Sequence, residues 1–197
     1  MPDKAHAPDA TCLTGHLLIA MPAMQDPNFT KTVTYICEHT DQGALGIIIN
    51  RPMGMDLGTI FDQLELDNHD PDLARQPVLH GGPVHQERGF VLHEPDTGGE
   101  DGFDATVAVA DGIRVTTSQD ILSAMARGNG PRRAVVALGY AGWGAGQLES
   151  ELGQNAWLSV PATAQIIFET PFQQRWHESG RLLGIDLSLL TQQAGHA

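Results

Sequence analysis

The chain has 197 residues, 41% of them hydrophobic, with 24 acidic and 11 basic side chains and a formal net charge of −13. Its length fits a single domain, and no apolar run approaches the ~20 residues of a membrane-spanning helix. Binding to nucleic acid or to an anionic membrane surface requires clustered Lys and Arg, so the composition argues against both kinds of partner.

The N-terminal segment differs in composition from the rest of the chain. Residues 1–10 are polar and contain two prolines, without the basic and apolar regions of a secretory signal peptide. We therefore predict a disordered tail over residues 1–12 and a single domain over residues 13–197. The two cysteines, Cys12 and Cys37, form no recognisable motif, which favours a reduced, cytoplasmic setting.

Three strands are predicted near the start of the domain, over residues 15–21, 32–39 and 44–50. The second alternates as a half-buried strand does, and the third is apolar throughout, which indicates burial on both faces. The short turn between them predicts an antiparallel hairpin. Pro52 is expected to end the third strand, because proline lacks a backbone donor.

The middle of the chain predicts one helix and several strands. Apolar residues at helical spacing from Leu57 to Leu64 indicate an amphipathic helix. The dipeptide Asp111-Gly112 is a common two-residue hairpin turn. Further along, we expect an acidic loop at 67–77, strands at 78–80 and 89–93, an exposed loop at 94–104, and hairpin strands at 106–110 and 113–116.

The last third predicts helices that alternate with strands. Ser118 is a suitable N-cap for a helix that Gly128 would stop. Thr170 and Pro171 have the residue types of an N-cap and first position for a final helix, which is expected to break or end at Gly180. Between these helices we expect strands at 134–138, 156–160 and 165–168, a glycine-rich loop after residue 138, and a helix at 147–153. Grouped strands and about four helices indicate an α+β fold with a mainly antiparallel sheet.

The glycine-rich stretch from Leu138 to Glu149 contains four glycines within eight residues, with Tyr140 and Trp143 between them. A strand, a glycine loop and a helix in this order can bind phosphate, but neither familiar nucleotide-binding fingerprint is present. Glu149 would also repel a phosphate at the start of the helix. Two interpretations remain: a structural turn, or a ligand or partner site that uses Tyr140, Trp143 and Gln147.

Histidine and cysteine offer two other chemistries. Cys37 and His39 share one face of a predicted strand and could act as nucleophile and base. The alternative is that Cys37 is a small buried hydrophobic residue. No pair among the histidines and cysteines has the spacing of a zinc site, so neither a metal nor a cofactor is predicted.

Two further segments lie where a pocket could form. Asn50-Arg51-Pro52 follows a buried strand, and its polar side chains could line a cavity. They could equally cap the strand and pair with a surface acid. The second segment, His80-Gly81-Gly82-Pro83-Val84, could be a plain tight turn or could direct backbone N–H groups toward a ligand.

These blocks together carry a resemblance to a known family. The segments 15–29, 35–52, 81–84, 89–93, 138–149 and 155–158, with Arg175-Trp176 and residues 183–186, resemble the YqgE/AlgH family of bacteria in order and spacing. The resemblance runs from about residue 13 to residue 190. It implies a single α+β domain with a barrel-like, mostly antiparallel sheet flanked by helices. It also implies a small soluble protein without an established biochemical activity, in a family of which some members carry the label of transcriptional regulator.

Our leading hypothesis is a protein that binds a small ligand or a protein partner and has an indirect regulatory role. An enzyme that uses His80 or Glu149 as base and Cys37 as nucleophile is the alternative. Direct transcriptional control is the third, and the net charge disfavours it. The predicted pocket would use Arg51 to hold an anion and aromatic walls to enclose it. Its candidate residues are Asn50, Arg51, Pro52, His80, Gly81, Gly82, Pro83, Tyr140, Gly142, Trp143, Gly144, Gln147 and Glu149.

Overall fold

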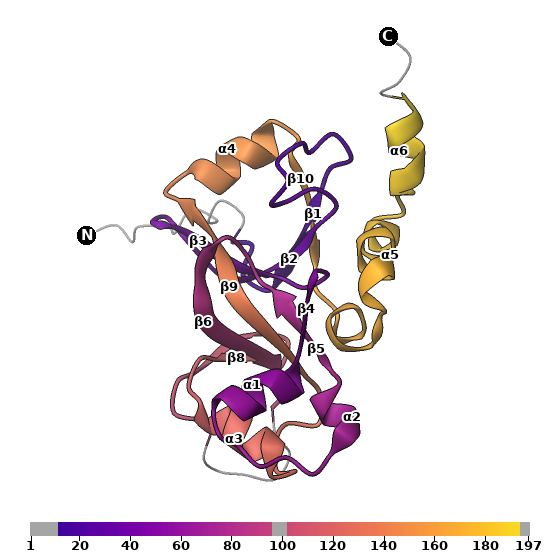
Figure 1. The fold of residues 1–197 in the computed structure, drawn as a ribbon. Coiled ribbons are helices and arrows are strands. Elements are labelled where there is room, and N and C mark those ends of the chain that lie inside the picture. Colours follow the sequence, from indigo (N-terminus) through magenta and orange to yellow (C-terminus); the bar gives the residue numbers. More distant parts are fainter. Residues whose placement is uncertain (1–11, 96–101, 194–197) are drawn as a thin grey trace, which may run out of the picture.

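Ten strands form one curled, mainly antiparallel sheet in the computed structural model, which describes residues 12–95 and 102–193 (Figure 1). The principal path through the sheet is β10-β1-β2-β3-β9-β6-β8-β7, and β5 joins β4 to β9. The strands are β1 (His16–Ala20), β2 (Val33–Thr40), β3 (Gly43–Ile48), β4 (Pro52–Asp56), β5 (Pro77–His80), β6 (Val84–His93), β7 (Thr106–Ala110), β8 (Ile113–Thr116), β9 (Ala134–Gly144) and β10 (Trp157–Pro161).

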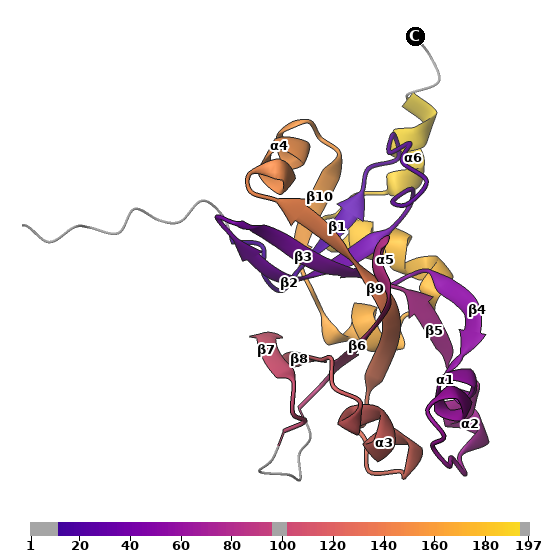
Figure 2. The ribbon, with the colours of Figure 1, turned by 60° about the vertical axis from the view of Figure 1, so that its left-hand side comes forward.

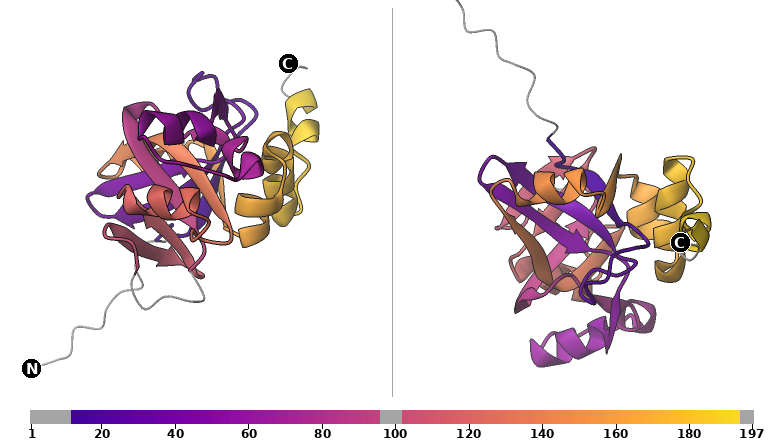
Figure 3. Two further views of the ribbon diagram at one scale, coloured as in Figure 1. Left: turned by 60° about the horizontal axis from the view of Figure 1, so that its bottom comes forward. Right: turned by 90° about the horizontal axis from the view of Figure 1, so that it is seen from above.

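Helices cover both ends and one side of this sheet. Figure 1 shows α4 at one end and α1 and α3 at the other, and both views in Figure 3 place α5 and α6 beside the strands. No helix in the described ranges is long and apolar enough to cross a membrane. The helices are α1 (Leu57–Gln63), α2 (Pro71–Ala74), α3 (Asp120–Ala126), α4 (Gln147–Gly153), the π-helix η1 (Gln165–Glu169), the 3₁₀-helix η2 (Phe172–Gln174), α5 (Arg175–Leu182) and α6 (Leu187–Gln193).

Strand β9 connects the two halves of the sheet, as Figure 2 shows. It pairs antiparallel with β3 and β6 and parallel with β5. The prediction of a glycine-rich loop after residue 138 is wrong, because the strand continues to Gly144. Gly139 has a φ of 78°, and a Cβ there would lie 2.4 Å from the carbonyl oxygen of Gly82. This glycine therefore permits two backbones to approach closely within the sheet.

The core occupies both faces of the sheet. One cluster, which includes Leu17, Tyr35 and Leu92, fills the inside of the curl. A second lies beneath α1 and α3, and a third lies beneath α4. Burial on both faces confirms the prediction for the apolar third strand, in which Ile47 and Ile48 are fully buried. The observed arrangement confirms the predicted α+β class and the antiparallel hairpins of β2 with β3 and β7 with β8.

Several local predictions differ from the structure. Residues 165–168 lie in the π-helix η1 rather than in a strand. Ile166 and Ile167 are buried in the core there, and a short apolar run does not distinguish such a helix from a strand. The predicted loop at 67–77 contains the short helix α2, which begins after the N-cap Asp70. Strand β6 begins at Val84, so it is longer than predicted.

Helix boundaries were also mispredicted in two places. The N-cap of α3 is Gln119, while Ser118 instead bonds to Asp120 and to the amide of Ala105. Residues 172–174 form a 3₁₀-helix before α5 begins at Arg175. Gly180 neither breaks nor ends α5, which continues to Leu182. The absence of a side chain at Gly180 leaves room for Leu187, because a Cβ would lie 2.8 Å from Leu187 Cγ. Of the predicted tail, residues 1–11 lie outside the described residues.

Candidate functional site

Asn50 and Arg51 bind the loop that precedes β2. Asn50 accepts a hydrogen bond from the amide of Val33 at 2.9 Å and donates one to the carbonyl of Lys31 at 2.8 Å. The Arg51 guanidinium donates to three carbonyls of this loop, at 2.7–2.9 Å, from Pro27, Asn28 and Thr30. Desolvation by burial lowers the pKa of Arg51. Both side chains therefore hold the loop against the end of β3.

The segment from His80 to Pro83 crosses β9 at close range. Gly81 donates its amide to Leu138 and accepts from the amide of Ile48, each at 2.8 Å. At Gly82, which has a φ of 154°, a Cβ would lie 2.1 Å from the carbonyl carbon of Tyr140. The amide of His80 donates to the carbonyl of Arg51 at 2.7 Å. The backbones of the predicted pocket segments thus meet around β5 and β9, and Pro52 pairs with Leu79 at the start of β4.

The later part of β9 holds α4. The indoles of Trp143 and Trp157 are 6% and 3% exposed and pack edge to face with each other. Both donate their Nε1–H to Glu151 Oε2, at 3.0 and 2.8 Å. Gln147 donates to the other oxygen of this carboxylate, at 2.9 Å, and accepts from the amide of Gly144 at 3.0 Å. Gly142 is exposed on the same strand.

Glu151 was not among the predicted site residues, although it receives three side-chain donors. The available signal in the sequence is that Glu151 follows Gln147 by four residues on a predicted helix, a spacing at which side chains can contact each other. Which tryptophans it would meet depends on the pairing of β10 with β1, and the local sequence does not contain that information.

Glu149 pairs with His39. The amide of Leu13 donates to His39 Nδ1 at 3.1 Å, so the ring carries its proton on Nε2 and donates it to Glu149 Oε1 at 2.8 Å. The backbone amide of Glu149, and then the His39 hydrogen bond, hold the pKa of this carboxyl below its usual value. This pair joins β2 to α4.

The Cys37 thiol does not have the properties of an activated nucleophile. Its Sγ lies 3.8 Å from the carbonyl of Tyr35, and burial raises its pKa, so the thiolate is disfavoured. The partner of His39 is Glu149 instead. This geometry gives no support to the enzyme hypothesis, in which Cys37 attacks a substrate.

Hydrogen bonds within the chain thus engage the polar groups of Asn50, Arg51, Trp143, Gln147 and Glu149. The backbones of Arg51, His80, Gly82 and Tyr140 lie together, whereas Trp143 and Gly144 pair with β3, and Gln147 and Glu149 belong to α4. Most of these side chains act as ties between elements. Ligand binding by them stays a prediction.

A groove of about 490 Å³ lies between α1 and α3, on the outer face of β6 and β9. Its lining is mainly apolar, and the long polar residues that contribute to it are Gln63, Glu87, Arg88 and Gln119. The guanidinium of Arg88 stacks over the ring of Phe90, at 5.6 Å from its centroid. The lining residues are Ile60, Gln63, Leu64, Glu87, Arg88, Gly89, Phe90, Val91, Thr116, Thr117, Ser118, Gln119, Leu122, Val136 and Leu138.

This groove was not predicted, because its residues come from α1, β6, the β8–α3 junction and β9. Each of these segments has the pattern of an ordinary core strand or helix. Only the tertiary arrangement leaves the space between the two helices open.

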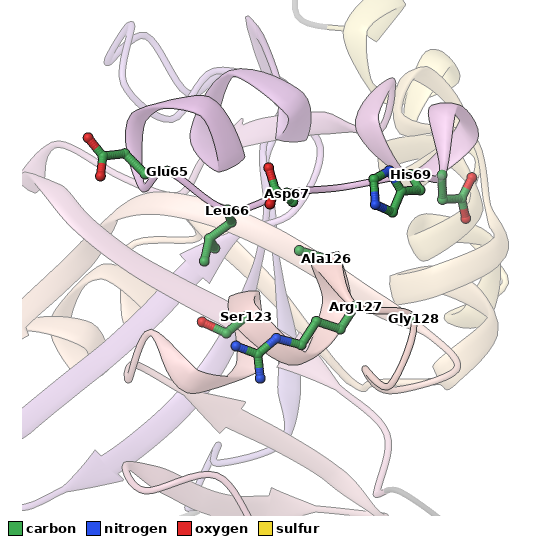
Figure 4. Close-up of a pocket in the computed structure, with 9 residues that line it drawn as sticks. Glu65, Leu66, Asp67, His69, Ser123, Ala126, Arg127 and Gly128 are labelled. Atoms are coloured by element: carbon green, nitrogen blue, oxygen red, sulfur yellow. The ribbon is translucent and has the colours of Figure 1, made fainter.

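A second cavity, of about 580 Å³, lies between the segment after α1 and the end of α3 (Figure 4). Figure 4 shows Asp67 and His69 on one side and Ser123 and Arg127 on the other. Its charged side chains are exposed. No group of three or more potential metal ligands occurs in the described part of the chain, and the acidic side chains here form no metal cage.

Comparison with known proteins gives the family. A model of the AlgH-like family matches residues 17–188, most of the chain. The chain belongs to the AlgH-like family.

Relatives of this AlgH-like protein are identical to it at about half of the aligned positions. A UPF0301 protein of Nitrosospira multiformis is 54% identical over 185 residues, which cover 94% of this chain and 97% of the relative. The solution structure of the AlgH protein from Pseudomonas aeruginosa superposes with a TM-score of 0.75 at 46% identity, covering 98% of this chain and all of that one. These matches confirm the resemblance seen in the sequence.

A more distant structure shows the same fold. Protein DIP2367 of Corynebacterium diphtheriae superposes with a TM-score of 0.71 at 19% identity, covering 96% of this chain and 94% of that one. The curled sheet with its helices is therefore kept by a chain with a very different sequence.

Proposed function

We propose that this AlgH-like protein binds a small, largely apolar ligand in the groove between α1 and α3. The observation that carries the proposal is the groove itself, whose volume of about 490 Å³ lies in the ~300–1,000 Å³ range of small-molecule sites. Its floor is formed by β6 and β9, which pair over six registered positions. Such a rigid floor favours a preformed site.

The chemistry of the lining supports an amphipathic ligand. Val91, Val136 and Leu138 provide an apolar floor, and burying apolar surface there supplies most of the binding free energy. Gln63 and Gln119 add side-chain amides that can donate hydrogen bonds. A ligand with an apolar body and one hydrogen-bond acceptor fits this combination.

A regulatory role would then be indirect. The net charge of −13 opposes contact with DNA phosphates, because every acidic side chain near a phosphate raises the cost of association. In this proposal, the ligand changes the affinity of the protein for another protein, and the site makes no direct contact with DNA.

A pair of glycine substitutions tests where a ligand binds. Gly89 lines the groove, and a Cβ there would meet only Leu138 Cδ2, at 3.9 Å, so Gly89→Leu should fill the groove without backbone strain. Gly144 belongs to the pocket predicted from sequence, and its Cβ would meet only Gln147 Oε1, at 3.9 Å. A library of amphipathic metabolites is first screened by thermal shift, since a ligand of the native state raises the melting temperature.

The expected result is that Gly89→Leu abolishes the shift of a confirmed ligand while Gly144→Leu retains it. The reverse pattern would reject the groove and support the pocket that was predicted from sequence. If both variants keep the shift, neither site binds the ligand. Circular dichroism of both variants checks that the fold is intact.

A further inference from the structure

Arg175, the first residue of α5, is a buried cation. Its side chain is 2% exposed, and the guanidinium stacks on Phe172 with 4.4 Å to the ring centroid. Nε donates to the carbonyl of Thr170 at 2.8 Å, and Nη1 donates to the carbonyl of Ile49 at 2.5 Å. Within the described residues, Nη2 has no hydrogen-bond partner, and no carboxylate pairs with this arginine.

This arrangement is unusual because arginines are almost never fully buried unless they are paired. Two carbonyls and an aromatic ring solvate part of the guanidinium, but they carry no negative charge. Arg133 gives a direct contrast, since it pairs with both Glu94 and Glu169. Burial lowers the pKa of Arg175 to about 10, so it still carries its charge at neutral pH.

The buried cation lines a cavity of about 140 Å³. A cavity of ~150 Å³ holds a molecule the size of benzene, whereas drug-sized ligands need ~300 Å³ or more. The space thus fits a small organic molecule and excludes a nucleotide. The walls are mainly apolar, formed by Leu57, Gln76, Pro77, Ala134, Val135, Val136, Phe168, Phe172 and Arg175.

We propose that Arg175 and this cavity form a binding site for a small organic carboxylate with a short apolar body. The carboxylate would accept a hydrogen bond from Nη2 and supply the missing negative charge, and the apolar body would pack on Phe168 and Phe172. A monoanion suits a site with one cation, because a phosphate dianion would bury a second charge without a partner. The site shares only Val136 with the groove described above, so it is independent of the proposed function.

The test is an NMR titration of the full-length protein at constant ionic strength. Butyrate, butyramide and inorganic phosphate are the three probes, and the readouts are the Nε–H signal of Arg175 and the side-chain amide signals of Gln76. We expect saturable shifts of both with butyrate only. Equal shifts with butyramide would show that the charge is irrelevant, and shifts with phosphate alone would reject the carboxylate class.

Two variants of α5 separate this site from general effects of charge. Arg175→Met should weaken butyrate binding at least tenfold, because a charge-assisted hydrogen bond is worth about that factor or more. Arg181→Met removes the same charge from an exposed position of the same helix, where Arg181 pairs with Glu178, and should leave binding unchanged. Unchanged butyrate binding in Arg175→Met would overturn the proposal.

A third variant tests the cavity in case Arg175→Met does not fold. Ala134→Leu narrows the cavity and retains the arginine. It should weaken butyrate binding by at least tenfold while the remaining NMR spectrum stays that of the folded protein. Full-affinity binding in this variant would place the butyrate outside the cavity and overturn the assignment.

Discussion

At the scale of single residues, Glu151 is the carboxylate with the most side-chain donors described above. Replacing it by alanine leaves the indole N–H groups of Trp143 and Trp157 buried without an acceptor. Each such loss costs ~1–3 kcal/mol. We therefore expect Glu151→Ala to lower the free energy of unfolding by about 2–4 kcal/mol, measured by urea denaturation with tryptophan fluorescence.

Glu149→Ala is the matched control for this prediction. It removes a glutamate from the same helix whose side chain is 48% exposed and which accepts one side-chain donor, Nε2 of the 5% exposed His39 ring. One buried donor loses its acceptor instead of two, so the expected loss is smaller, about 1–2 kcal/mol. If the two variants lose equal stability, the tryptophan network does not hold α4 in the way inferred here.

At the scale of elements, β9 depends on a glycine in its interior. Gly139→Ala forces a side chain into a positive φ and places Cβ 2.4 Å from the carbonyl oxygen of Gly82. We expect a loss of about 3 kcal/mol or more, because a strained φ alone costs ~1–3 kcal/mol. Gly144→Ala in the same strand meets only a side-chain oxygen at 3.9 Å and should change stability by less than about 0.5 kcal/mol.

Thermal unfolding of the two alanine variants, followed by circular dichroism, measures this difference. Similar melting temperatures for both would mean that β5 and β9 can move apart at little cost, contrary to their close contact in the structure.

The elements that could be predicted from sequence are those with a local signal. Residues 106–116 alternate around Asp111-Gly112, and the hairpin of β7 and β8 forms there. The glycines of β9 predict a loop when only the local sequence is considered. The close approach that requires Gly139 is made by Gly82, far away in the chain. Apolar residues 165–168 fit a strand or a helix equally well, and only their packing against the core selects the π-helix η1.

The same reason limits prediction of the site. Asn50 and Arg51 are polar residues at a strand end, which is a sound general signal for a pocket. The carbonyls that accept hydrogen bonds from these two side chains belong to the loop before β2, and a sequence does not show where that loop lies in the fold. The local sequence gives no sign that Arg175 is buried, because an arginine at the start of a helix is usually exposed.

At the scale of the whole molecule, acidity acts on stability in two opposing ways. Lowering the pH toward the sequence pI of about 4.9 removes negative charge and relieves repulsion. Local contacts act in the opposite direction. The pKa of Asp56 is lowered by the amide of Thr59, that of Asp186 by the hydroxyl of Ser188, and that of Glu149 mainly by its own amide.

A carboxyl whose pKa is lower in the folded state stabilises the protein above its unfolded pKa and loses this contribution as the pH falls through its folded pKa. The ordinary values are 3.8 for the aspartates and 4.5 for Glu149. We expect the melting temperature to be steady or to rise slightly from pH 7 to pH 5 and to fall below pH 4. Salt should weaken the first effect more than the second. A melting temperature that stays constant to pH 3 would contradict this assignment.

The order of strands in the sheet has a consequence for how the protein is made. Strands β3, β5 and β6 each pair with β9, and β1 pairs with β10. These pairings form only after β9 and β10 have been synthesised. The carbonyls of Ala20 and Ile49 receive their donors from Trp176 and Arg175, near the end of the chain. A nascent chain on the ribosome therefore carries open strand edges until its C-terminal part emerges. We therefore expect the domain to complete its folding only after residues 134–176 have been synthesised, and its early strands to be exposed to incorrect pairing until then.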